Sequence, residues 1–385
     1  MDFALTPEEQ DYKKELLEFL KKEMNEGVVA EVESMEGIGP YGKELIRKMG
    51  KRRLLTPSWP EKYGGRGLSY VTQAIMTYEL SYHQGPFPID AIVVGPPILH
   101  FGTDRQKEKF LPRISTGEID IALGYTEPGA GSDLASVQLR AVEHGDYFIL
   151  NGQKIYNTEA HHAEYHWLLT RTDTSVPKHK GMSLFIVDLK SPGITVRPLR
   201  TSAGLRTNEV FYEDVRVPKE DMIGGKNNGW DCVNAALGGE RASVAGDVKQ
   251  RFDKFIRYLI EEKGYNNIDA ENSWIPDELA EVDIRLHLSE LLSFKAVSML
   301  DKGHTLIYEP SVIKLYLSET RRQLFNAAME ILGHYGELSE GSKRAPMNGV
   351  IEREYLDACR WTIVAGSSEI QRYVIALRGL GLPRK

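Results

Sequence analysis

The hydrophobic pattern divides the 385 residues into a helical, a β and a second helical part. The segment Thr6–Glu9 predicts a helix start, because Thr is a good N-cap, Pro suits the first helical position and Glu can complete a capping box. Apolar residues then recur at helical spacing, at Tyr12, Leu16, Phe19 and Leu20. Gly and Pro separate further expected helices, around 42–50, 70–84 and 104–112.

Short apolar runs replace the helical period after Gly117. The run Tyr147–Leu150 is followed by Asn151-Gly152 and a second run, Gln153–Tyr156. This pattern predicts a β-hairpin, because Asn-Gly tolerates the positive φ angles of a tight turn. Other strand candidates, each bounded by Gly, Pro or charged residues, are Trp167–Thr170, Met182–Val187, Ile194–Pro198 and Glu209–Val217. The middle third is expected to be an antiparallel β domain.

The helical period returns at Asn228 and continues to the end, with irregular interruptions at Gly264–Pro276 and Glu340–Asn348. The expected fold class is α+β, mainly α. The expected domains are an N-terminal helical domain (1–118), a middle antiparallel β domain (119–225) and a C-terminal helical bundle (226–385).

Composition and charge narrow the possible partners. The net charge of −7 is not gathered into an acidic or basic block, so no nucleic-acid partner is expected. The N-terminus lacks a basic-then-apolar signal, and no apolar run approaches membrane-spanning length. A soluble, cytoplasmic protein without membrane insertion is expected. Cys232 and Cys359 lie far apart and show no metal-binding spacing, which fits a reducing compartment.

The segment Gly124–Asp133 (GYTEPGAGSD) is the richest candidate for chemistry and is called the Gly-rich loop below. Its glycines and Ser132 would let backbone N–H groups and a hydroxyl approach a phosphate or a flat ring. A plain turn before a strand fits the same pattern. The loop by itself leaves both interpretations open.

The Gly-rich loop resembles the flavin-contacting loop of the acyl-CoA dehydrogenase family. Four other stretches are similar to family motifs in the family's order, namely Gly152–Thr158, Val210–Pro218, Ala365–Arg372 and Gly379–Arg384. The resemblance spans the whole chain and implies the family's plan of helical domain, β domain and C-terminal four-helix bundle.

The resemblance implies FAD as the cofactor and assigns roles to residues within the matching motifs. Thr126 would hydrogen-bond the pyrimidine end of the isoalloxazine, and Thr158 would place its hydroxyl near flavin N5, the hydride acceptor. Tyr156, more often Trp in the family, would pack against the ring. The other implied FAD contacts are Leu123, Tyr125, Gly131, Ser132 (at the pyrophosphate), Ser367 and Glu369. Without the resemblance, the hydroxyls could simply satisfy local backbone groups.

The catalytic base departs from the commoner family pattern. Many members carry Glu directly before the Gly of the C-terminal signature, where this chain has Ala365. A second subgroup, which includes isovaleryl-CoA dehydrogenase, carries its Glu before an Arg on a helix, and this chain has Glu240-Arg241 there. The resemblance therefore implies Glu240 as the base, whereas without it the pair could face solvent. The backbone N–H of Ala365 would polarise the thioester carbonyl. Ser132, Arg241 and Gly366 would contact substrate.

Other departures concern the far side of the cofactor. The family's Arg followed by Phe-Gly, which reaches the FAD of a neighbouring subunit, is missing from Glu261–Asn267. Glu330–His334 likewise has Glu for Gln and His for Gly. His161, His162 and His166 cluster after Gly152–Thr158, but packing or hydrogen bonding is favoured over a metal site, since the family uses no metal.

The expected activity is FAD-dependent α,β-dehydrogenation of an acyl-CoA thioester to the 2-enoyl-CoA. Proton abstraction by Glu240 would accompany hydride transfer to flavin N5, with electrons passed to electron-transfer flavoprotein or a similar acceptor. A homotetramer or dimer is implied. Alternatives are a flavin oxidase or monooxygenase on the same fold, and a non-catalytic or partner subunit of a heteromeric flavoprotein. Operation as an enoyl-CoA reductase also stays open, as does the acyl group.

Overall fold

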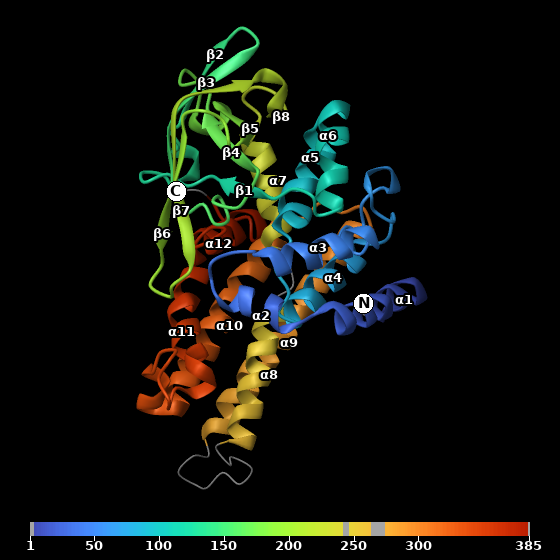
Figure 1. Ribbon diagram of the computed structural model, residues 1–385, viewed down its shortest axis with the longest axis vertical. Helices are drawn as coiled ribbons and strands as arrows, with labels where there is room; N and C mark the ends of the chain where they lie inside the picture. Colours follow the sequence, from blue (N-terminus) through green and yellow to red (C-terminus); the bar gives the residue numbers. More distant parts are fainter. Residues whose placement is uncertain (1–3, 242–245, 263–273, 384–385) are drawn as a thin grey trace.

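The computed structural model describes residues 4–241, 246–262 and 274–383. A β sheet occupies one end of the long axis, and helices α8 and α11 reach the other end (Figure 1). The N-terminal helices are α1 (Pro7–Glu23), α2 (Glu26–Glu33), α3 (Pro40–Lys51), α4 (Tyr70–Tyr82), α5 (Gly95–Phe101) and α6 (Asp104–Ser115). The expected fold class is confirmed.

The N-terminal helices confirm most of the sequence expectations. Thr6 caps α1 with the reciprocal Thr6–Glu9 hydrogen bonds of a capping box. Two helices were not predicted. Helix α2 buries one residue, Val28, so it has little apolar period. Helix α5 begins with Gly and two prolines, which look like a loop in the sequence, although Pro is well tolerated in a first helical turn.

The middle part folds into one eight-stranded sheet. Its strands are β1 (Ile121–Gly124), β2 (Arg140–His144), β3 (Tyr147–Lys154), β4 (Tyr165–Arg171), β5 (Met182–Asp188), β6 (Ile194–Arg200), β7 (Arg206–Pro218) and β8 (Met222–Ile223). The order is β6-β7-β3-β2-β4-β5-β8, and β1 pairs with β4. The antiparallel prediction holds for the ladders except β1–β4, which is parallel, and one parallel pair between β2 and β4.

The predicted hairpin turn at Asn151-Gly152 is wrong. Strand β3 runs through both residues, and the ladder to β7 shifts register between Leu150 and Gly152. Asn151 exchanges two hydrogen bonds of 2.9 Å with Asp214 across this bulge, and Gly152 has φ 144°. A bulge and a tight turn both need a residue that tolerates unusual φ, so Asn-Gly suits either structure. The hairpin turn is Gly145-Asp146, between the paired His144 and Tyr147.

The C-terminal part contains α7 (Gly229–Arg241), α8 (Gly246–Glu261), α9 (Trp274–Asp301), α10 (Glu309–Leu332), α11 (Val350–Trp361) and α12 (Ser368–Val374). Helices α8 to α11 pack around one apolar core, as in a four-helix bundle. Glu340–Asn348 is irregular up to Pro346, as expected. The expected interruption at Gly264–Pro276 lies outside the described residues up to residue 273, and Trp274–Pro276 already belong to α9.

Helix α7 connects the two helical parts. Its buried residues Cys232, Val233 and Ala236 share a core with α1 to α6 and with strands β4 and β5. No helix in the described part of the chain is long and apolar enough to cross a bilayer. The domain boundaries at 118 and 225 stay a prediction; α6 ends at Ser115, and α7 begins at Gly229.

Candidate functional site

A cavity of about 420 Å³ lies where the three parts of the chain meet. Residues of α2, α3 and the segment before α5 form one wall, and Thr158 and Glu159 contribute from the β part. Helices α8, α10 and α11 form what we call the helical wall, with Asp247, Gln250, Arg251, Leu317, Arg321, Glu354, Asp357, Arg360 and Trp361. The volume is in the range of small-molecule sites.

A buried ion pair supports the Gly-rich loop. Lys154 Nζ donates to Glu127 Oε1 at 2.8 Å and to the Tyr125 carbonyl oxygen at 2.9 Å. The Glu127 carboxylate also accepts the backbone N–H groups of Gln138 and Leu139. Burial lowers the pKa of Lys154 to about 8. Sequence reasoning missed this pair, although a lysine within a predicted strand was a signal.

The Gly-rich loop is open on its outer side. A Cβ atom at Gly129 or Gly131 would meet nothing within 4 Å, and Ser132 is exposed. The half-buried Thr126 accepts the Ile155 N–H at 2.9 Å through its carbonyl oxygen. The buried ion pair holds the Gly-rich loop from its inner side, and open space lies beside both glycines on its outer side. This arrangement fits a loop that cradles an extended anionic cofactor.

The segment Tyr156–Thr158, which follows β3, presents two predicted FAD contacts to the exterior. Buried Asn157 is anchored through its backbone N–H to Asn208 O at 2.9 Å and through Nδ2 to Leu123 O at 3.1 Å. On either side of it, Tyr156 has φ 61° and is 60 % exposed, and exposed Thr158 lines the cavity. An exposed aromatic ring beside an exposed hydroxyl fits the predicted packing against a flat cofactor.

His166 lies beneath the same region. Its Nδ1 hydrogen-bonds the Tyr212 hydroxyl, and a Cβ at Gly124 would lie 2.6 Å from its imidazole. Burial lowers the pKa of His166 to about 3. The buried imidazole therefore stays neutral and supports strand β1.

This burial predicts acid sensitivity. Between about pH 6.5 and 3 the unfolded chain binds a proton at His166 that the folded chain does not bind, so the unfolding free energy falls as the pH falls. His166 is expected to lower the unfolding free energy by about 1.4 kcal/mol for each pH unit of acidification within this range. Urea unfolding at several pH values between 6.5 and 5 gives the unfolding free energy as a function of pH. This free energy should fall less steeply with falling pH in His166→Gln than in wild type. His334→Gln, at a fully exposed side chain, is the control. Parallel slopes for all three proteins would contradict the prediction.

Glu240 lies in the last turn of α7, half-buried, beside Tyr125 of the Gly-rich loop. Burial and the Glu240 charge raise the pKa of Tyr125 well above its usual value. The helix is held close to the segment before α5, since a Cβ at Gly239 would lie 2.7 Å from Ile92 O. The predicted base therefore adjoins the predicted cofactor loop. The Arg241 side chain lies outside the described residues.

The Ala365 loop has an unusual backbone. Ala365 has φ 53° and Gly366 has φ 95°. Gln371 Nε2 donates to both of their carbonyl oxygens, at 3.2 and 2.8 Å. Ser367 caps α12 by accepting the Ile370 N–H, and the pKa of Glu369 is lowered by a backbone N–H and by the Ser367 hydroxyl. Buried Gln371, which sequence reasoning missed, thus fixes the loop that carries the predicted carbonyl donor.

Three sequence models of one family match successive parts of the chain. They are described as "Acyl-CoA dehydrogenase, N-terminal domain" (residues 6–118), "Acyl-CoA dehydrogenase, middle domain" (122–215) and "Acyl-CoA dehydrogenase, C-terminal domain" (227–380). The chain belongs to the acyl-CoA dehydrogenase family. Members of this family are FAD flavoproteins and oxidoreductases that act on acyl-CoA.

Relatives match over nearly their whole length. "Acyl-CoA dehydrogenase FadE26" of Mycobacterium tuberculosis (strain ATCC 25618 / H37Rv) is 32% identical, with 100% of this chain and 99% of the relative covered. The "Caffeyl-CoA reductase-Etf complex subunit CarC" of Acetobacterium woodii is 32% identical, with 93% and 94% covered. The structure of the ChsE4-ChsE5 complex from Mycobacterium tuberculosis is similar with TM-score 0.87 and 32% identity, with 100% of both chains covered.

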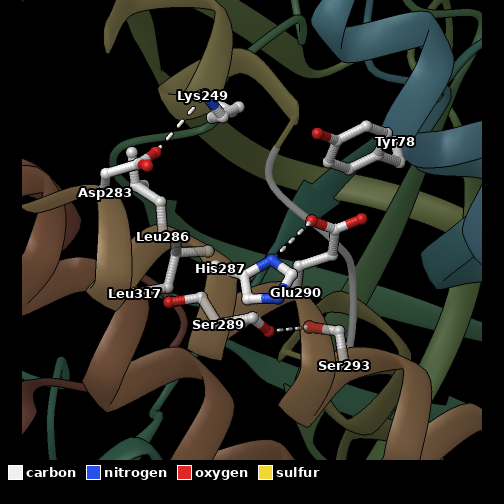
Figure 2. Close-up of a pocket in the computed structure, with 9 residues that line it drawn as sticks. All are labelled: Tyr78, Lys249, Asp283, Leu286, His287, Ser289, Glu290, Ser293 and Leu317. Carbon is white, nitrogen blue, oxygen red and sulfur yellow. Dashed lines mark hydrogen bonds and ion pairs between the residues drawn. The ribbon is translucent and has the colours of Figure 1, made fainter. Parts of the chain in front are cut away.

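A second, smaller cavity of about 190 Å³ lies between α4, α8, α9 and α10 (Figure 2). Its charged side chains pair with one another, Lys249 with Asp283 at 3.5 Å and His287 with Glu290 at 3.9 Å. Leu317 contributes to the walls of both cavities. None of the residues predicted from family motifs lines this smaller cavity.

Phe87 is 42 % exposed and lines the large cavity. His161 bonds Glu36 O through Nε2 and Asn208 through Nδ1, as hydrogen bonding rather than metal ligation would require. Within the described ranges, no group of three or more His, Cys, Asp or Glu residues could hold a metal ion.

Proposed function

We propose that the chain is an FAD-dependent acyl-CoA dehydrogenase with Glu240 as its catalytic base. The observation that carries this proposal is the half-buried Glu240 carboxylate beside Tyr125, on a chain whose other base position is Ala365. Partial burial favours proton abstraction, because it removes the water that would otherwise stabilise the carboxylate. Helix α7 is packed into the core and holds the carboxylate in place.

The chain's own residues would bind the thioester and move its α-proton to Glu240. The Ala365 N–H would stabilise the charge that develops on the thioester carbonyl, with its loop fixed by Gln371. Ser132, Arg241 and Gly366 would contact the substrate. Bound FAD supplies the acceptor for the hydrogen that leaves the β-carbon. The residues proposed to hold it are Leu123, Tyr125, Thr126, Gly131, Ser132, Tyr156, Thr158, Ser367 and Glu369.

Anaerobic titration of the purified yellow protein tests this function. We expect a panel of straight, branched, alicyclic, aromatic and dicarboxylic CoA esters to contain at least one that bleaches the flavin absorbance, with the 2-enoyl-CoA as product. Admitting air then separates a dehydrogenase from an oxidase or monooxygenase on the same fold, because those react quickly with O₂. Absence of bleaching by the whole panel would contradict the proposal.

The electron acceptor is proposed to be electron-transfer flavoprotein or a similar protein. The CarC relative is named as a subunit of a reductase–Etf complex, which supports such a partner and keeps the reductase direction as a candidate. Reduced acceptor and 2-enoyl-CoA mixed with the protein should yield acyl-CoA if the redox partner allows the reverse direction.

A heteromeric assembly is the second candidate arrangement, beside the homotetramer or dimer. Two observations favour it, namely the missing Arg before Phe-Gly and the ChsE4-ChsE5 relative, which is named as a complex. In this arrangement a second chain would complete the FAD site. Light scattering and FAD content of the protein expressed alone test it. A yellow homotetramer with one FAD per chain would contradict the need for a second chain.

A further inference from the structure

The helical wall of the large cavity carries balanced charge. Arg251 pairs with Glu354 at 3.1 Å and with Glu33, and Arg321 pairs with Asp247. Arg360 pairs with Asp357 at 2.6 Å. Each of the three guanidinium groups on this wall thus has a carboxylate partner. A carboxylate on the acyl group would find no unpaired cation there and would face Asp247, Glu354 and Asp357.

The other walls do not favour a cationic ligand either. Burial raises the pKa of Asp90 and of Glu159, which disfavours their charged forms. Asp120 is paired with Lys43 at 2.6 Å, and Glu31 accepts the N–H groups of Tyr41 and Gly42. The cavity is therefore suited to a neutral ligand group.

Two buried polar atoms on the helical wall have no hydrogen-bond partner among the described residues. They are Gln250 Oε1, an acceptor on a residue 7 % exposed, and Arg321 Nε, a donor on a residue 5 % exposed. Both residues line the cavity. Buried polar groups of native proteins are nearly always satisfied, so this wall lacks one donor and one acceptor.

The two atoms belong to neighbouring side chains. Asp247 and Gln250 are three residues apart on α8 and so lie on one face of the helix. Arg321 reaches that face from α10, because its guanidinium pairs with Asp247. The Trp361 ring, which also lines the cavity, packs against the same guanidinium, with Arg321 Cζ 4.5 Å from the ring centroid.

We propose that this wall recognises a neutral alcohol group on the acyl part of the substrate. The hydroxyl would donate to Gln250 Oε1 and accept from Arg321 Nε. A ketone can only accept, a methyl group does neither, and a carboxylate adds an unbalanced charge. The inference rests on the proposed function, since it places the acyl group of a CoA thioester in the cavity that Thr158 lines.

Matched substrates test the inference with the full chain and bound FAD. Saturated acyl-CoA esters of about six to twelve carbons are compared as terminal methyl, terminal hydroxyl and terminal carboxylate forms. We expect the hydroxyl form to exceed the methyl form in kcat/KM by about tenfold or more at the best length, and the carboxylate form to be the poorest. A methyl or carboxylate form equal to or better than the hydroxyl form at every length would overturn the inference.

Two variants test whether the helical wall causes the preference for the hydroxyl form. Gln250→Leu should bring the hydroxyl-to-methyl ratio of kcat/KM close to one, because the acceptor is lost. Gln323→Leu, on α10 and bonded to Glu278 outside the cavity, should keep the wild-type ratio. An unchanged ratio in Gln250→Leu would overturn the inference. Flavin bleaching by the methyl forms alone would overturn the inference and leave the proposed function intact, which only absence of bleaching by the whole panel of CoA esters would contradict.

Discussion

Glu240→Gln is expected to abolish substrate-dependent flavin bleaching while leaving the bound FAD in place. The amide keeps the shape of the side chain but cannot accept the α-proton, so the loss falls on the chemical step. General-base removal costs up to about 10⁴-fold, and we expect at least about 10³-fold here. Stopped-flow measurement of flavin absorbance under anaerobic conditions gives the rate, and the shift of the flavin spectrum on ligand addition shows that acyl-CoA still binds.

The matched control is Asp231→Asn, which removes an exposed carboxylate from the first turn of the same helix. Its bleaching rate should equal that of the wild type. A near-normal rate in Glu240→Gln would remove Glu240 from the role of base.

Lys154→Met is expected to destabilise the Gly-rich loop and to cause loss of FAD. The substitution leaves the buried Glu127 carboxylate with only its two backbone N–H partners and removes the hydrogen bond to Tyr125 O. Breaking a buried ion pair by removing one partner typically costs about 3–5 kcal/mol. Chemical unfolding monitored by circular dichroism measures the stability, and the ratio of flavin to protein absorbance measures the FAD content.

Lys178→Met is the matched control, because it breaks an exposed pair with Asp133 at the end of the same loop. Exposed pairs contribute about 0–1 kcal/mol, so both measurements should stay near wild type. Equal losses in the two variants would show that the buried pair has no special role in holding the loop.

The fold could be predicted from the sequence where local pattern and tertiary structure agree. Thr6–Glu9 begins a helix because capping depends on a few adjacent residues. Asn151-Gly152 was predicted to be a hairpin turn but forms a bulge. Its tolerance of positive φ suits both structures, and only the pairing with the partner strand decides between them. Helix α2 was not predicted because its stability depends on contacts that its own sequence does not show.

The proposed site could be predicted where family motifs are contiguous. The Gly-rich loop, Thr158 and Glu240 each lie within such a motif, and the structure brings Tyr125 and Glu240 together. The large cavity was not predictable, because its helical wall is assembled from Gln250, Arg321 and Trp361 on three separate helices. No spacing in the sequence relates these residues to one another.

The Glu33 carboxylate accepts from three donors on separate segments. Gln84 follows α4 and donates to it at 2.6 Å, while Arg251 and Arg353 reach it from α8 and α11. This half-buried carboxylate therefore links the first helices to the last bundle. Heating should melt both helical regions in one transition, and severing this link should let the N-terminal region open first.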